Sequence, residues 1–195
     1  MHDPAAWDTG YRQTTQPWDI GRPQRPFAEL EYAGRVVDVG CGTGEHTLLA
    51  AERGAQALGI DFAPAAIELA RAKAAARGLE ARFEVLDAFE LSSLDERFEL
   101  AIDSGLYHTW ADASERRRYA AGVASVLEPG GMIYLMCFSE RTAGDWGPQR
   151  IHEDELRETF GTGWEVERLE RSAFDLNPGM PVEQADAWLL VARRC

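Results

Sequence analysis

Cysteine is scarce in this chain of 195 residues, with only Cys41, Cys137 and Cys195 present and no CxxC spacing among them. An odd number of widely separated cysteines argues against a disulfide framework and against a structural zinc site, and it favours a reducing compartment, the cytoplasm. Long hydrophobic runs are also missing, since the longest apolar candidate, residues 132–138, has only the length of a strand. The N-terminus lacks a basic segment followed by an apolar one, so no signal peptide is expected.

Basic residues are outnumbered as well. The chain has 20 Lys and Arg against 33 Asp and Glu, which gives 20 − 33 = −13 at pH 7. Nucleic acids and anionic membranes bind clustered Lys and Arg, so we expect neither as a partner. The run ERRR at residues 115–118 is interpreted as a solvated helix face, and the histidines have no metal-ligand spacing, so no metal is expected. The charge suits a small or cationic ligand, or solubility alone, and we expect a monomer or a homodimer.

Short apolar runs and longer amphipathic segments alternate from residue 35 onward. Proline fits the first turn of a helix and glycine its exit, as at Pro64 and Gly78. Strands separated by helices of this length predict βαβ units, and therefore an α/β fold with a parallel sheet and helices on both faces. The expected strands are residues 35–39, 56–60, 81–86, 98–103 and 132–138, and the expected helices are residues 45–53, 64–77 and 114–127, the last capped by Ser114.

The pattern changes after residue 139. A loop rich in Gly, Pro and Trp precedes an expected helix at 153–160, and two strand-like runs, 164–169 and 185–192, flank a turn with the sequence NPG. These runs predict a terminal β-hairpin. We therefore expect a single domain over residues 1–195. Its parts are an N-terminal arm (1–34) laid over the ligand edge of the sheet, a ligand-binding core (35–138), and a late loop, helix and hairpin (139–195).

The most informative stretch is VVDVGCGTGEHT, residues 36–47, in which three glycines stand between a strand and a helix. Glycine is suited to a sharp turn where the backbone approaches a ligand closely. The dinucleotide pattern GxGxxG is absent, because Glu45 occupies its last position, and a bulky acid there would repel a pyrophosphate. No GK[ST] follows, which excludes a Walker loop. A nicotinamide-dependent oxidoreductase is therefore disfavoured, and we expect a ligand that is not bound through phosphates.

Aspartates stand at or near the ends of four successive expected strands. Asp38 lies inside the first, Asp61 ends the second, Asp87 follows the third and Asp103 closes the fourth. Each alone reads as a helix cap or a turn residue. Parallel sheets bind ligands at the carboxyl ends of their strands, so together these acids predict the lining of a ligand crevice.

The order DVGCGTG, GID, an aspartate after the third strand, FELAID and VLEPGG resembles the class I S-adenosylmethionine-dependent methyltransferases. The resemblance covers residues 35–138, and the hairpin extends it. It implies a Rossmann-like, seven-stranded, mostly parallel sheet with an antiparallel last strand, and S-adenosyl-L-methionine as cofactor, converted to S-adenosyl-L-homocysteine. The positions implied to contact the cofactor are Asp38, Gly40, Cys41, Gly42 and Gly44 around the methionine part, Asp61 at the ribose, Phe62, Asp87 and Ala88 around adenine, and Asp103.

A narrower resemblance lies outside that core. The segments QPWDIGRPQ (16–24), DSGLYHTW (103–110) and CFSE…GDWGPQR (137–150) look like the thiopurine S-methyltransferase and halide/thiol methyltransferase group and its small bacterial relatives. By this resemblance Trp18 lies over the cofactor, and a thiol, thiolate or halide-like nucleophile is the expected acceptor. The alternatives are O-methylation of a phenolic or quinol hydroxyl and, from another class, a non-catalytic sensor that binds S-adenosylmethionine.

Methyl transfer is an in-line displacement that needs alignment and exclusion of water, with a base only for a protonated nucleophile. His108, in the loop after the fourth strand, is the candidate base or acceptor-orienting group, and Tyr107 is a weaker candidate. The alternative for His108 is a loop histidine that contacts backbone. Aromatic rings on loops often line pockets, although ordinary packing is the alternative for each. The expected acceptor pocket contains Trp7, Tyr11, Trp110, Phe138, Trp146 and Arg150, the last a candidate for an anionic acceptor or a solvated surface residue.

Overall fold

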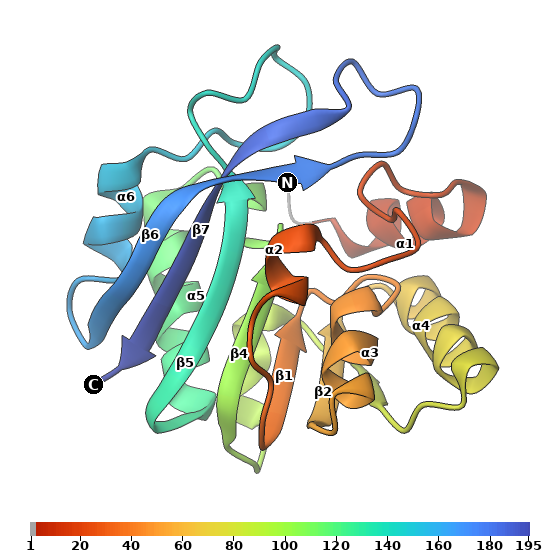
Figure 1. Ribbon diagram of the computed structural model, residues 1–195, viewed down its shortest axis with the longest axis horizontal. Helices are drawn as coiled ribbons and strands as arrows, with labels where there is room; N and C mark the ends of the chain where they lie inside the picture. Colours follow the sequence, from red (N-terminus) through yellow and green to blue (C-terminus); the bar gives the residue numbers. More distant parts are fainter. Residues whose placement is uncertain (1–2) are drawn as a thin grey trace.

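Seven strands form one sheet in the order β3-β2-β1-β4-β5-β7-β6 (Figure 1). The computed structural model describes residues 3–195. Strands β1 to β5 all run parallel to their neighbours within that group, and β7 runs antiparallel to both β5 and β6. The Rossmann-like, mostly parallel sheet with an antiparallel last strand is therefore confirmed. The strands are β1 (Arg35–Val39), β2 (Gln56–Asp61), β3 (Arg82–Val85), β4 (Phe98–Ser104), β5 (Leu127–Phe138), β6 (Trp164–Asp175) and β7 (Gln184–Arg194).

Helices cover both faces of this sheet, as expected (Figure 1). Side chains alternate across each strand, so Val37 and Val39 of β1 pack in one buried cluster with α5 and α6, while Val36 packs in another with α2 and α3. Both faces are buried at the centre of the sheet, so strands β1 and β2 are mostly apolar, whereas the edge strands β3 and β6 are more polar and more exposed. The helices are α1 (Pro4–Gln13), α2 (Arg25–Ala28), α3 (Glu45–Glu52), α4 (Pro64–Arg77), α5 (Ala113–Val126) and α6 (Glu153–Thr159), with short 3-10 helices η1 (Ala88–Ser93) and η2 (Tyr107–Thr109).

Some boundaries differ from the expectations. The cap of α5 is Asp112, whose side chain accepts a hydrogen bond from the backbone N–H of Ser114, so the expected Ser114 cap is wrong by two positions. The turn sequence EPGG lies within β5, where the pairing with β4 skips from Leu127 to Met132. Strand β6 runs to Asp175, well past the expected end, because β7 pairs with it along its whole length. All helices of residues 3–195 are too short or too polar for a transmembrane span.

The N-terminal helix α1 packs beside the start of α4 (Figure 1). The residue that precedes α4, Ala63, has no side chain to cap the helix. Instead, Oδ1 of Asp8 accepts a hydrogen bond from the backbone N–H of Ala65 at 2.7 Å. Arg12 of α1 also pairs with Glu68 of α4 at 3.3 Å. The N-terminal cap that α4 lacks in its own sequence is thus provided by a side chain of the arm.

Candidate active site

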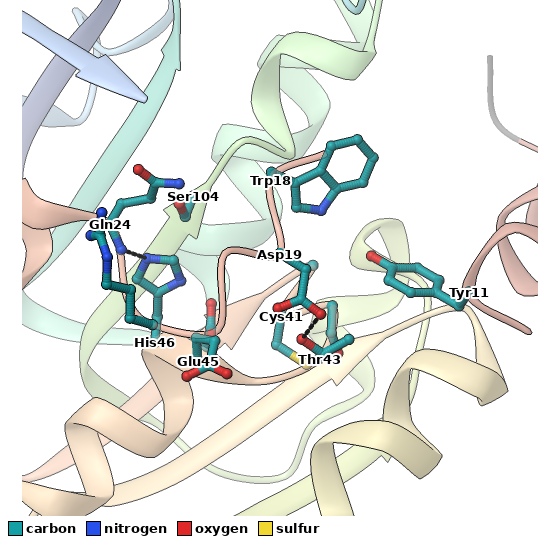
Figure 2. Close-up of a pocket in the computed structure, with 13 residues that line it drawn as sticks. Tyr11, Trp18, Asp19, Gln24, Cys41, Thr43, Glu45, His46 and Ser104 are labelled. Atoms are coloured by element: carbon teal, nitrogen blue, oxygen red, sulfur yellow. Dashed lines mark hydrogen bonds between the residues drawn. The ribbon is translucent and has the colours of Figure 1, made fainter. Parts of the chain in front are cut away.

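A cavity lies between the glycine loop, which joins β1 to α3, and the arm segment 16–24 (Figure 2). The arm contributes one wall, and the loop with the first turn of α3 contributes the opposite wall. The lining residues are Tyr11, Trp18, Asp19, Arg22, Gln24, Asp38, Gly40, Cys41, Gly42, Thr43, Glu45, His46 and Ser104. This set brings together five of the expected cofactor positions, Trp18, Asp38, Gly40, Cys41 and Gly42. The other expected positions, Gly44, Asp61, Phe62, Asp87, Ala88 and Asp103, do not line it.

The glycine loop has the left-handed backbone that its sequence predicts. Gly40, Gly42 and Gly44 have φ values of 69°, 53° and 86°. A Cβ atom on Gly42 would lie 3.0 Å from the hydroxyl oxygen of Tyr11, so the arm approaches the bare backbone closely at this point. Side chains at these three positions would strain the turn, and a side chain at Gly42 would also displace the arm.

Two aspartates of adjacent strands hold the base of this loop. Asp38 is 1% exposed and accepts a hydrogen bond from the hydroxyl of Thr47 at 2.6 Å, and burial raises its pKa to about 7. The carboxylate of Asp61 accepts from the backbone N–H groups of Gly42 at 3.0 Å and Ala63 at 2.9 Å, and burial raises its pKa too. Asp61 therefore ties the glycine loop to the end of β2.

The other two aspartates shape loops. Asp103 is fully buried and accepts hydrogen bonds from the backbone N–H groups of Leu106 at 2.8 Å and Tyr107 at 3.0 Å, and burial raises its pKa to about 7. It is Ser104, one residue later, that lines the cavity. Asp87 caps η1 by accepting from the N–H of Phe89 at 2.8 Å. The expectation of four acids facing one crevice is corrected accordingly, because turn formation takes up the carboxylates of Asp103 and Asp87.

A charged clamp joins the arm, the glycine loop and α4. Lys73 of α4 places its Nζ 3.0 Å from Asp19, 2.8 Å from Glu45 and 2.6 Å from the hydroxyl of Thr43. Arg77 adds a second bond to Glu45 at 2.9 Å, and Thr43 donates to Asp19 at 2.8 Å, the latter drawn in Figure 2. The charge of Glu45 is therefore compensated. Because Lys73 and Arg77 pair with Glu45, this acid gives no ground for excluding a pyrophosphate, contrary to the expectation from the sequence.

Sequence reasoning missed most of the arm residues in the cavity wall. Gln24 is 2% exposed, and its side-chain amide forms two hydrogen bonds with the backbone of Asp175, at 3.0 and 2.8 Å. Its backbone N–H donates to Nε2 of His46 at 3.1 Å (Figure 2), and burial lowers the pKa of His46 to about 4. The segment QPWDIGRPQ was the available signal, but it was interpreted only for Trp18.

The two candidate catalytic residues do not have the surroundings of a general base. Nδ1 of His108 accepts a hydrogen bond from the N–H of Phe138 at 2.7 Å, and burial, with the charge of Arg150, lowers its pKa to about 3. Tyr107 is fully buried, donates its hydroxyl to Thr159 at 2.9 Å, and has a pKa raised by burial. His108 thus contacts backbone, the alternative considered for it, and Tyr107 belongs to the core; both placements argue against base catalysis, while an acceptor-orienting role of His108 stays a prediction.

The aromatic residues expected in one acceptor pocket lie in three places. Trp7 and Tyr11 pack with Trp18 on the arm, with the Trp7 ring centroid 6.4 Å from that of Tyr11 and 5.5 Å from that of Trp18. Trp110 is buried in the core beneath η1 and α5. A third group, which we call the aromatic wall, comprises His108, Phe138, Trp146 and Phe174. Their ring centroids lie 4.6 to 5.8 Å apart in contacting pairs.

Arg150 is built into the loop that carries part of this wall. Its guanidinium donates to the backbone carbonyls of Thr142 at 3.1 Å, Pro148 at 2.7 Å, Gly144 at 3.0 Å and Trp146 at 2.8 Å. The same group lies 5.3 Å from the ring centroid of Phe138 and 5.7 Å from that of Trp146. Arg150 is neither a solvated surface residue nor open to an anionic acceptor, because its N–H groups are engaged by the loop.

Comparison with known proteins now identifies the family. Residues 36–131 match the family model described as "Methyltransferase domain". The chain is 36% identical over 160 residues to a 2-heptyl-1-hydroxyquinolin-4(1H)-one methyltransferase of Mycobacteroides abscessus, which covers 78% of this chain and 70% of that relative. The chain belongs to the class I S-adenosylmethionine-dependent methyltransferases.

The similarity extends beyond the matched core of this methyltransferase. A structure described as "Conversion of a Disulfide Bond into a Thioacetal Group during Echinomycin Biosynthesis" is 35% identical with a TM-score of 0.88, and it covers 99% of this chain and 92% of that one. A "Probable thiol methyltransferase 2" of Arabidopsis thaliana is 24% identical over 191 residues, 93% of this chain and 83% of the relative. The arm and the terminal strands are therefore shared features.

The residues of the cavity fit S-adenosylmethionine, the cofactor of this methyltransferase. Asp38 is a buried carboxylate that accepts one hydrogen bond from a hydroxyl. A cation stabilises such a group, and the cofactor carries two cationic groups, a sulfonium and an ammonium. The glycine turn brings backbone groups to the cavity without side chains in between. The family assignment also excludes the two other classes considered from the sequence, a nicotinamide-dependent oxidoreductase and a non-catalytic sensor. Glu45 is no longer needed to exclude the first of them.

Proposed function

We propose that this methyltransferase acts on a small aromatic or apolar acceptor whose nucleophile is already an anion, in the first place a thiolate, with halide ions in the same class. One observation carries the proposal. The candidate proton acceptors, His108 and Tyr107, have surroundings unsuited to a general base.

None of the four residues of the aromatic wall lines the cavity, but two short stretches of chain connect them to residues of the cavity wall. Ser104 lines the cavity, and a Cβ on the next residue, Gly105, would lie 3.4 Å from Nε2 of His108 and 3.6 Å from the ring of Phe174. Phe174 in turn precedes Asp175, whose backbone holds Gln24 in the cavity wall. An acceptor packed against these rings would stand beside the cofactor, where apolar surroundings exclude water.

The chemistry of the nucleophile follows from the missing base. A sulfonium is a good leaving group, so alignment of an anion with the methyl carbon is sufficient for displacement. A thiol, with a pKa of about 8.5, supplies some thiolate at neutral pH, whereas a phenol, with a pKa of about 10, needs a base. A histidine with a pKa of about 3 that already accepts a hydrogen bond from backbone provides little base catalysis.

A second candidate is O-methylation of an acidic hydroxyl on an aromatic ring. It is favoured by the 36% identity to the enzyme named for a 1-hydroxyquinolin-4(1H)-one. A hydroxyl that ionises near neutral pH would meet the same requirement as a thiol. In this case His108 would still orient the acceptor and would not remove its proton.

We further propose that residues 1–195 act as one methyltransferase domain whose arm closes over the cofactor. Asp8 at α4 and the clamp of Lys73, Asp19 and Thr43 are the contacts that support closure. Around adenine, Phe62, Asp87 and Ala88 remain the proposed neighbours, and Asp61 the proposed partner of the ribose.

The test is a panel of aromatic thiols, halides, N-hydroxy heterocycles and plain phenols, with methylated products and S-adenosylhomocysteine measured by mass spectrometry. Thiols or acidic hydroxyls should be methylated, with plain phenols slower by at least tenfold. His108→Ala should slow thiols and hydroxyls by the same factor, since it disturbs packing. Preferential methylation of plain phenols, with a loss on His108→Ala confined to them, would contradict the proposal and restore His108 as a base.

A further inference from the structure

The charges that line the cofactor cavity are unevenly compensated. Three carboxylates line it, Asp19, Asp38 and Glu45, and among the lining residues Arg22 is the single cation, because the lowered pKa of His46 leaves that ring neutral. Asp19 and Glu45 are both paired with Lys73. Asp38 has only the hydroxyl of Thr47 as a side-chain partner. Among residues 3–195, Asp38 is therefore the carboxylate of this lining that has no cationic partner, although Oε2 of Glu45 also lacks a hydrogen-bond partner.

Arg22 is held loosely. Its Nη2 donates to Asp175 at 2.8 Å and its Nη1 donates to the carbonyl of Pro23 at 3.4 Å, and the side chain is 52% exposed. Asp175 also accepts from Arg25 at 3.0 Å and from Gln184 at 2.7 Å. Burial alone would raise the pKa of Asp175, but the hydrogen bonds from Arg22, Gln184 and Arg25 hold it at about 2. Asp175 consequently stays charged and partnered when Arg22 turns away.

The backbone around Arg22 is fixed, in contrast to its side chain. On one side Gln24 is anchored to the backbone of Asp175 and to His46. On the other side the amide of Asn177 donates to the carbonyl of Asp19 at 2.9 Å. A guanidinium carried on a fixed segment, with more N–H groups than it uses, is suited to bind a carboxylate through two parallel hydrogen bonds.

We propose that Arg22 binds the carboxylate of the cofactor's methionine part while Asp38 faces its ammonium. An α-amino acid head group carries one charge of each sign on neighbouring groups. Asp38, which has no cationic partner in the part of the chain that the structure describes, and Arg22, whose exposed side chain can exchange Asp175 for another carboxylate, match that pair. On binding, Arg22 exchanges Asp175 for the ligand carboxylate. The inference concerns the cofactor only and does not depend on which acceptor is methylated.

The experiment measures binding by calorimetry, without turnover, for S-adenosylmethionine and for decarboxylated S-adenosylmethionine, which lacks only the carboxylate. Three proteins are compared, wild type, Arg22→Gln and Arg25→Gln. Arg25 is the matched control, because it pairs with the same Asp175 but does not line the cavity. Melting temperatures of all three establish that the variants fold.

Wild type should bind S-adenosylmethionine roughly 10- to 100-fold more tightly than the decarboxylated ligand, as expected for a hydrogen-bonded charge pair. Arg22→Gln should bind S-adenosylmethionine more weakly than wild type by that same factor. It should bind the decarboxylated ligand with an affinity within threefold of wild type. Arg25→Gln should preserve the wild-type preference.

Two results would overturn the proposal. If Arg22→Gln weakens both ligands equally, Arg22 serves the arm and not the carboxylate. If it weakens neither, the carboxylate is bound elsewhere. Because no methyl acceptor is present, a failure of the acceptor proposal leaves these outcomes unchanged, and a failure here leaves the acceptor panel intact.

Discussion

The two sides of this active site are built in different ways. On the cofactor side, a glycine turn, strand-end aspartates and the arm meet through hydrogen bonds and ion pairs, and buried acids have raised pKa values. On the proposed acceptor side, rings from β5, β6 and the 139–151 loop pack together, and the buried His108 has a lowered pKa. In the proposed arrangement, charged groups bind the cofactor and packed aromatic rings bind the acceptor. Substitutions on the two sides should therefore affect different binding constants.

The largest effect is expected from Asp38→Asn on the cofactor side. Asparagine keeps a hydrogen-bond acceptor for Thr47 but removes the negative charge that a cationic cofactor stabilises. Affinity for S-adenosylmethionine should fall on the order of 100-fold, as for other buried charge pairs that lose one partner. Calorimetry measures it, with Asp112→Asn as control, since Asn caps a helix about as well as Asp. An unchanged dissociation constant would remove Asp38 from the cofactor site.

Arg150→Ala should produce a smaller loss, confined to the acceptor side. Without the guanidinium, the carbonyls of the 142–148 segment lose their shared donor and Trp146 is no longer held beside Phe138. We expect the KM for the acceptor to rise roughly tenfold, by analogy with the loss of hydrogen bonds to a charged group, with cofactor affinity unchanged. Arg150→Lys should not restore the wild-type KM, since an ammonium group cannot donate to several carbonyls in one plane as a guanidinium does.

The control for Arg150 is Arg141→Ala on the same loop, where the side chain is 66% exposed. That variant should retain the wild-type KM. A change in cofactor affinity in Arg150→Ala, equal to the change in acceptor KM, would show that the two sides are not separable.

Proton linkage should distinguish the two sides further. Burial raises the pKa of Asp38 to about 7, and a bound cation favours its carboxylate form, so cofactor binding below pH 7 should release a proton. Affinity should fall by up to about tenfold per pH unit below 7. In the folded protein the pKa values of Asp38 and Asp103 lie above the ordinary value of 3.8, so the free energy of unfolding of the free protein should decrease as pH rises from about 4 to 7.

The proton release is measurable by calorimetry at pH 6 in buffers of different ionisation enthalpy. Repeating it with Asp38→Asn should abolish the release. Equal cofactor affinity at pH 5.5 and pH 8 would contradict a buried acid at the cofactor site.

The smallest effect is expected from Asp8→Ala, which removes the cap that α1 provides to α4. Loss of an N-cap costs about 1 kcal/mol of helix stability, and part of it should appear as looser closure of the arm. We expect a few-fold faster dissociation of the cofactor in stopped-flow measurements. Arg12→Gln removes the ion pairs of Arg12 to Glu68 and to Asp8 but leaves the Asp8 carboxylate as the cap of α4, so it should change the rate less.

Local signals in the sequence were sufficient for the fold. Proline and glycine punctuation placed the helix Pro64–Arg77 at both ends, because those residues act through their own backbone. An acid inside an apolar strand also singled out Asp38. The glycine turn was identifiable for the same reason, since each conformation depends on residues close in the chain.

Contacts between distant residues decided the rest of the site. Glu45 was interpreted as a free acid because nothing near it in sequence shows that Lys73 and Arg77 lie beside it. Tyr107 and Trp110 follow a strand, but Asp103 draws the loop into a 3-10 turn that buries both rings. Sequence position identified a loop, and only packing could show which face of it is turned to the ligand.

The most direct test of the account is the pH dependence of kcat/KM for two thiol acceptors of different pKa, measured with saturating S-adenosylmethionine. If the acceptor arrives as an anion and no residue deprotonates it, each profile should rise with pH to an inflection at the pKa of its own acceptor. An inflection that stays at one pH for both thiols would show that a group of the enzyme removes the proton, and it would contradict the account.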